Sequence, residues 1–204
     1  MNNNINDTLI AELICTRISH DLIGNVGAVA NAVELLEEGD MDFLDDIKSI
    51  LKVSSSVLSA RQKFFRMAFG LENANLENMP LVRKTTEEYL ATLGNRNFPI
   101  ELQMAVQNPK FSRPAMVGIM VLADTIIKGG WIKAEERNGK LYIGSHSDAE
   151  PSKEKTAALK NICEGKDCEV SAQFAPAFYL KKILNFAGYD LAFIEDGVLG
   201  LVMG

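Results

Sequence analysis

The sequence predicts an α+β fold in which an antiparallel hairpin of two long helices precedes an α/β layer, with helices packed on one face of a small sheet. Apolar residues recur every three or four positions over residues 7–38 and 42–69, the pattern of amphipathic helices. Past Gly70 this spacing ends, and asparagines and a proline mark a change of structure. Further on, Asn138-Gly139 separates two short segments, a strong signal for a two-residue β-hairpin.

The first helix is expected over residues 7–38, with Asp7 or Thr8 as its N-cap and Gly39-Asp40 at its end. The second is expected over residues 42–69. Its apolar residues form two neighbouring stripes, namely Leu44, Ile47, Leu51, Leu58 and Phe65, and beside them Phe43, Ile50, Val57 and Phe64.

A short connection at residues 39–41 predicts that the two helices are antiparallel, and a single partner helix cannot cover both stripes. We therefore expect a homodimer in which two hairpins form a four-helix bundle. The alternative is that the C-terminal half of the same chain covers the second stripe.

We expect two domains, a dimerising hairpin at residues 1–75 and an α/β domain at residues 76–204. In the second domain the sequence predicts helices at 82–93, 113–128 and 175–186, and strands at 100–106, 131–134, 140–145, 191–194 and 198–203. A turn at Asp196-Gly197 would join the last two strands, and the polar stretch before the last helix is assigned no element.

Composition excludes several classes of function. A net charge of −6 over 204 residues argues against nucleic acid and anionic lipid as partners, because both require a basic excess. With no long apolar run and no signal-peptide pattern, we expect a cytoplasmic protein without a membrane span. Three cysteines without a C-x-x-C pair, and two histidines, predict no metal site.

His20 is predicted to lie on the side of the first helix that faces away from the hydrophobic core. It lies two residues from Ile18 and from Leu22, which belong to the apolar stripe, and two residues correspond to about 200° around a helix. Neutral imidazole is nucleophilic near pH 7, so an exposed histidine can accept a group covalently. Asp21 could hold the imidazole in one tautomer, and Arg17 could steady phosphoryl oxygens.

The face of the helix around His20 carries little bulk. Gly24 and Gly27 share it, together with Asn31, and each glycine inside a helix costs up to about 1 kcal/mol relative to alanine. Close approach of another backbone would explain them. The alternatives are a kink at Gly24, or packing of both glycines against a neighbouring helix.

The run RISHDLIGNVGAV from Arg17 to Val29, continued by NAVELLEE from Asn31 to Glu38, resembles the phosphoacceptor helix of ChpT-type histidine phosphotransferases of alphaproteobacterial phosphorelays. It is similar, more distantly, to the H-box of sensor histidine kinases. In these families Ser, Thr or Asn and then Pro usually stand where this chain has Gly24 and Asn25.

The resemblance implies a dimerising hairpin joined to a domain shaped like a histidine-kinase ATP-binding domain that has lost nucleotide binding. His20 would take a phosphoryl group from the receiver domain of a hybrid histidine kinase and pass it to a response-regulator receiver. Gly24, Asn25, Gly27 and Asn31 would form the receiver docking surface. No cofactor is expected on this chain, and Mg²⁺ would be needed only in the receivers.

The sequence argues against two other activities. An ATP-dependent autokinase of this architecture would carry an asparagine on the helix at 112–128 and a D-x-G-x-G loop, and neither occurs. A hydrolase would depend on His146 and Asp148, which we expect in a solvent-exposed polar loop without a G-x-S-x-G motif. A non-catalytic dimeric adaptor that docks receivers stays open, because only the chemistry of His20 separates it from a phosphotransferase.

Overall fold

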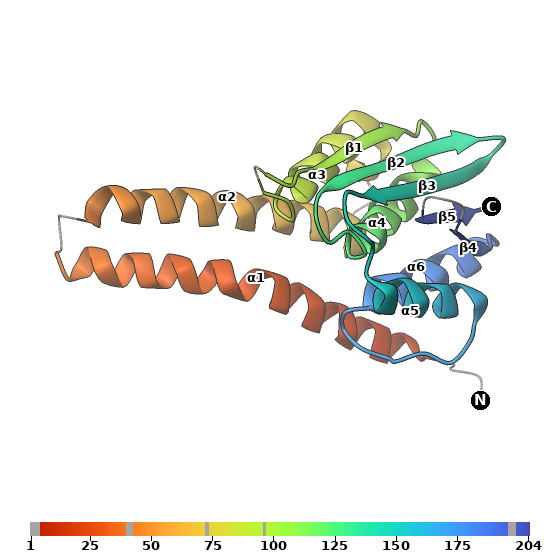
Figure 1. Cartoon of the computed structure of the whole chain (residues 1–204), viewed down its shortest axis with the longest axis horizontal. Coiled ribbons are helices and arrows are strands. Elements are labelled where there is room, and N and C mark those ends of the chain that lie inside the picture. The colour runs from red at the N-terminus through yellow and green to blue at the C-terminus, as the bar shows by residue number, and fades with distance from the viewer. Residues whose placement is uncertain (1–4, 40–42, 72–73, 96, 196–198) are drawn as a thin grey trace.

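The computed structural model describes residues 5–39, 43–71, 74–95, 97–195 and 199–204. Two long helices, α1 (Asp7–Glu37) and α2 (Leu44–Phe69), pack side by side as an antiparallel hairpin whose far end stands clear of the rest of the molecule (Figure 1). The predicted hairpin is therefore confirmed. The expected start of the second helix at residue 42 lies outside the described residues.

The N-cap of α1 is Asn6, and the prediction of Asp7 or Thr8 was wrong. The Asn6 side chain accepts a hydrogen bond from the Leu9 backbone N–H at 2.7 Å. Asparagine and aspartate cap equally well, and Asp7 then lies in the first turn, where the helix dipole favours negative charge. At the other end Gly39 has a φ of +76°, the left-handed conformation that commonly follows a helix.

The rest of the chain forms a five-stranded mixed sheet with helices against it. Its strand order is β1-β2-β3-β5-β4, with β1 parallel to β2 and all other neighbours antiparallel. Alternate residues of the central strands are buried, so helices cover one face, as predicted. The elements are η2 (Ala74–Glu77), α3 (Met79–Ala91), β1 (Ile100–Ala105), η3 (Pro109–Phe111), α4 (Ser112–Ala123), β2 (Gly130–Arg137), β3 (Lys140–Ser147), α5 (Lys153–Glu164), α6 (Ala175–Phe186), β4 (Leu191–Glu195) and β5 (Leu199–Met203).

Two local predictions about this region differ from the structure. The helix expected to reach residue 128 ends at Ala123, and the chain enters β2 through Gly129 and Gly130, both with positive φ. A Cβ at Gly130 would fall on the carbonyl oxygen of His146, so this position requires glycine. The polar stretch that was assigned no element contains α5, whose amphipathic pattern rests on few apolar residues. The expected turn at 196–197 lies outside the described residues.

The main hydrophobic core joins the hairpin to the sheet. Phe64 and Phe65, near the end of α2, are buried together with almost the whole of α4 and with the inward residues of the strands. Phe64 was expected in the second stripe of the hairpin, and it packs on α3 instead. The C-terminal end of α2 is therefore part of the α/β core, while no other described element lies over the far half of the hairpin (Figure 1).

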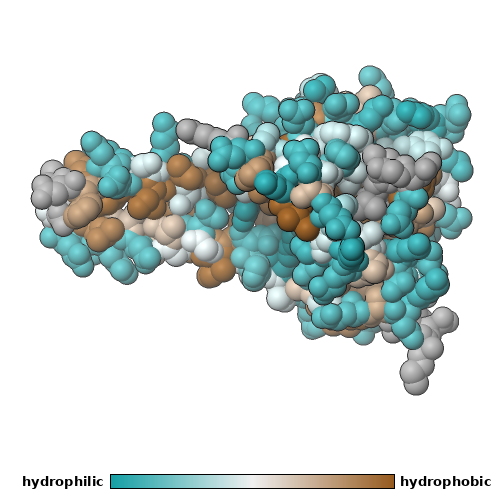
Figure 2. Space-filling model, in the orientation of Figure 1, coloured by the Kyte–Doolittle hydropathy of each residue, from teal (hydrophilic) through white to brown (hydrophobic). Residues whose placement is uncertain are grey.

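That far half exposes apolar side chains. Figure 2 shows hydrophobic residues gathered along the projecting hairpin. Ala32 and Ile47 are buried between the two helices. Large apolar residues of both helices stay exposed around them, namely Ile23, Val26, Val33, Leu35 and Leu36 of α1, Ile50 and Val53 of α2, and the α2 N-cap residue Phe43. Among the described residues, no helix is long and apolar enough to cross a membrane.

Candidate functional site

His20 lies near the middle of α1 with its side chain 84% exposed. The predicted outward placement is confirmed. Ile18 and Leu22, two residues on either side of His20, pack against the main core and hold this part of α1 in place. The imidazole thus stands on a rigid helix and can be reached by a second protein.

Asp21 is the nearest acidic group to His20. Its Oδ1 lies 3.5 Å from the imidazole Nδ1, which leaves Nε2 directed away from the carboxylate. Its Oδ2 accepts a hydrogen bond from Nε of Arg17, one turn earlier, at 2.9 Å. The Asp21 side chain is only 15% exposed, so its carboxylate is held between a cation beneath it and the imidazole above.

Arg17 has its guanidinium directed inward. Nη1 and Nη2 donate to the two carboxylate oxygens of Asp124 at 2.8 and 2.9 Å, and Nη1 also donates to the Gln173 carbonyl at 3.1 Å. Burial would lower the pKa of the Arg17 guanidinium, but the hydrogen bonds and charges of Asp124 and Asp21 outweigh burial and raise it above its ordinary value. The donors that we expected at phosphoryl oxygens are engaged here, so that role would require Arg17 to leave Asp124.

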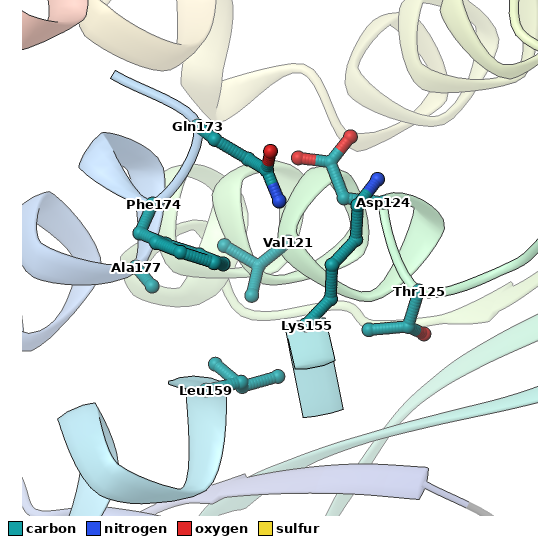
Figure 3. A pocket seen from close by; sticks show the side chains of 8 residues that line it. All are labelled: Val121, Asp124, Thr125, Lys155, Leu159, Gln173, Phe174 and Ala177. Atoms are coloured by element: carbon teal, nitrogen blue, oxygen red, sulfur yellow. The ribbon is translucent and has the colours of Figure 1, made fainter. Parts of the chain in front are cut away.

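Asp124 was not identified as a site residue from the sequence. It is the C-cap residue of α4, at the rim of a small cavity of about 20 Å³ between α4, α5 and α6 (Figure 3). Its carboxylate lies on the same side as the Gln173 side chain (Figure 3). The one available signal was that Asp124 is the only acidic residue at 112–128, but 107 residues separate it from Arg17.

Arg61 of α2 is the second residue that sequence reasoning missed. Its Nη1 donates to the backbone carbonyl of Asp21. Its Nε and Nη2 donate to the side-chain and backbone oxygens of Thr92 at 3.1 and 3.2 Å. Arg61 therefore ties the helix at the site residue to the end of α3.

The predicted docking residues lie on α1 beyond His20. Gly24, Gly27 and Asn31 are exposed and Asn25 is half-buried. No described atom would lie within 4 Å of a Cβ at Gly24 or Gly27, apart from the neighbouring backbone of α1 itself. Packing within the chain therefore does not require glycine at either position, which removes the neighbouring-helix alternative for the isolated chain.

His146, the other histidine, lies on β3 and not in a loop as predicted. Its ring stacks on Trp131 of the adjacent strand, with centroids 5.8 Å apart. Strand alternation sends the preceding residue inward, so Ser145 is buried and His146 is exposed. Within the described ranges, no three His, Cys, Asp or Glu side chains are grouped so that they could hold a metal ion.

Comparison with known proteins gives one sequence match and several structural ones. No family model matches the chain. A stretch of 61 residues is 48% identical to the protein phosphotransferase ChpT of Brucella abortus (strain 2308), covering 30% of this chain and 28% of that relative. This match supports the predicted likeness to ChpT-type proteins.

The fold comparison covers the whole chain. A solved structure described as a bacterial phosphotransferase matches all of this chain and all of its own, with a TM-score of 0.79 at 20% identity. That likeness shows a shared fold. The blue-light activated histidine kinase of Erythrobacter litoralis EL346 aligns with 91% of this chain and 58% of its own, with a TM-score of 0.42 at 10% identity.

Proposed function

We propose that this chain is a histidine phosphotransferase of the ChpT type, which relays a phosphoryl group through His20. The donor is the aspartyl phosphate of a receiver domain in a hybrid histidine kinase, and the acceptor is the receiver aspartate of a response regulator. The observation that carries the proposal is the highly exposed His20 imidazole with the Asp21 carboxylate at its Nδ1. The match to ChpT supports it independently.

Transfer to His20 uses the nitrogen that faces away from Asp21. With Nδ1–H directed at the carboxylate, the Nε2 lone pair attacks the phosphorus of the donor, the bond between phosphorus and the aspartyl oxygen breaks, and the donor carboxylate leaves. The ring gains positive charge as the N–P bond forms. Asp21, held close to Nδ1, stabilises that charge.

The second transfer reverses these steps. A carboxylate oxygen of the acceptor receiver attacks the phosphorus, the N–P bond breaks, and its electron pair returns to Nε2, which restores neutral imidazole. Because the ring keeps its Nδ1 proton throughout, the imidazole leaves as a neutral group. In this proposal Mg²⁺ is bound by the receivers, where it offsets the charge of the phosphoryl oxygens.

The receivers dock on the bare face of α1. Gly24 and Gly27 offer no side chain to obstruct a ring of receiver loops, and Asn25 and Asn31 supply polar groups at its edge. Two copies of the chain associate through the exposed apolar side chains of the hairpin, because such a surface is costly to leave in water.

The test is transfer from a phosphorylated receiver in the presence of Mg²⁺ and without ATP. We expect an acid-labile, alkali-stable phosphoryl group on the wild-type chain. His20→Gln should abolish the label, and His146→Gln is the matched control because these are the two histidines of the chain. Circular dichroism should show both variants folded.

Two results would replace the proposal. Absence of label from several donor receivers, and from ATP, would favour the non-catalytic adaptor. Label from ATP alone, at His20, would favour an autokinase.

A further inference from the structure

A partly buried cluster of charged groups lies next to His20, where the hairpin meets the α/β part. Arg17 and Asp21 come from α1, Arg61 from α2 and Asp124 from the end of α4. Two cations and two carboxylates make the cluster neutral. The side chains of Arg17, Asp21 and Asp124 are 12%, 15% and 20% exposed, so water screens their interactions weakly.

Successive side-chain contacts within this cluster connect the end of α4 to His20. The Asp124 carboxylate accepts hydrogen bonds from both terminal nitrogens of Arg17. The Arg17 Nε donates to Oδ2 of Asp21, and Oδ1 of Asp21 lies near Nδ1 of His20. An exposed Arg–Asp pair one turn apart on a helix is weak and mobile. Here the two-pronged contact with Asp124 fixes the plane of the guanidinium.

We infer that Asp124 is a positioning residue for the reaction of His20, acting through Arg17 to hold the Asp21 carboxylate against Nδ1. This inference rests on the proposed function. Asp124 does two things for Asp21. It orients the guanidinium so that only Nε meets Asp21, which leaves Oδ1 for the imidazole. It also shares the positive charge of Arg17, so that Asp21 keeps negative charge with which to stabilise the phosphorylated ring.

Removal of the Asp124 charge would change both the orientation of the Arg17 guanidinium and the negative charge that remains on Asp21. In Asp124→Asn the guanidinium has Asp21 as its only carboxylate, so it turns more fully toward Asp21 and neutralises it. The imidazole then loses its fixed tautomer and its counter-charge, although nothing in the docking face has been altered. The loss should therefore fall on the rate of phosphoryl uptake at saturating receiver, and not on the half-saturating receiver concentration.

The kinetic experiment compares Asp124→Asn and Arg17→Lys with Glu87→Gln, which removes a carboxylate from an exposed Arg–Glu pair on α3. We expect the first two to slow uptake about tenfold, as for loss of a hydrogen bond to a charged group, and the control to behave as wild type. Arg17→Lys keeps the charge but has a single nitrogen, so it cannot reproduce the two-nitrogen contact with Asp124 while a third nitrogen donates to Asp21. It therefore tests the same contact if Asp124→Asn folds poorly.

A double-mutant comparison separates positioning from general stabilisation. If Asp124 acts through Asp21, adding Asp124→Asn to Asp21→Asn causes no further loss. Additive losses would overturn the inference, as would wild-type rates in both Asp124→Asn and Arg17→Lys.

The tautomer of His20, measured by ¹⁵N NMR, needs no phosphotransfer and so separates this inference from the proposed function. Wild type should be mainly the Nδ1–H form, and both variants should shift toward the Nε2–H form. A wild-type chain that acquires no phosphoryl group from any donor receiver would contradict the proposed function. An unchanged tautomer in both variants would end the inference alone.

Discussion

The Phe64 ring of α2 stacks on the Tyr89 ring of α3, with centroids 3.9 Å apart and planes inclined by 12°. Both side chains are fully buried, and Phe65 packs edge-on against the same tyrosine. This aromatic contact fastens the base of the hairpin to the α/β part, just below the charged cluster. The Tyr89 hydroxyl has no hydrogen-bond partner among the described residues.

The first prediction concerns Tyr89. Because burial, and then the charge of Asp124, raise the pKa of Tyr89 above its ordinary value, its hydroxyl stays neutral at every working pH. A buried hydroxyl without a partner costs about 1–3 kcal/mol, so Tyr89→Phe should leave the free energy of unfolding unchanged or increase it. Phe64→Ala, by contrast, should lower it by about 3–5 kcal/mol. Urea unfolding followed by circular dichroism measures both, and a clear loss in Tyr89→Phe would mean that the hydroxyl has a partner.

A second prediction tests the bare face of α1. Gly24→Trp and Gly27→Trp should fold normally, because a Cβ at either position meets open space, but they should block transfer from a phosphorylated receiver. Glu154→Trp, which adds the same bulk at an exposed position of α5, is the control. Unchanged transfer rates in both glycine variants would remove the docking surface from α1.

The third prediction is that the exposed apolar residues of the hairpin hold a dimer together. Ile50→Glu and Val53→Glu should convert a dimer into a folded monomer in sedimentation experiments, because a charge cannot be buried unpaired in an apolar interface. Ser55→Glu, on the same helix at another exposed position, should leave the dimer intact. A wild-type chain that is monomeric at all concentrations tested would contradict the prediction.

Thiol chemistry provides a fourth prediction. Burial raises the pKa of Cys163 to about 12 from its ordinary 9.0, so this thiol stays protonated at pH 8, whereas Cys15 is exposed. A thiol reagent should modify Cys15 rapidly, and Cys163 only on unfolding. The contribution of protonated Cys163 to stability is complete below about pH 9 and is lost as pH rises toward 12. Rapid labelling of folded Cys163 at pH 8, read by mass spectrometry, would contradict this account.

Features that depend on local order could be predicted from the amino-acid sequence. The helical period of the apolar residues predicted the hairpin and the outward direction of His20, because each depends on residues within a few turns. Asn138-Gly139 predicted the tight connection of β2 to β3, where both residues have positive φ. The helix Ala175–Phe186 was predicted with its observed bounds.

Contacts between groups far apart in the sequence depend on how the helices and strands pack together. Helical spacing placed Arg17 near His20, but its inward direction depends on Asp124, and no local pattern pairs residues 107 positions apart. The same reason applies to Phe64. Periodicity assigns it to an apolar stripe of α2, but its stacking partner Tyr89 belongs to α3, a separate element. It applies also to His146, whose neighbour across the sheet is set by strand register. Periodicity fixes the face on which a side chain lies, and the packing of separate elements fixes its partner.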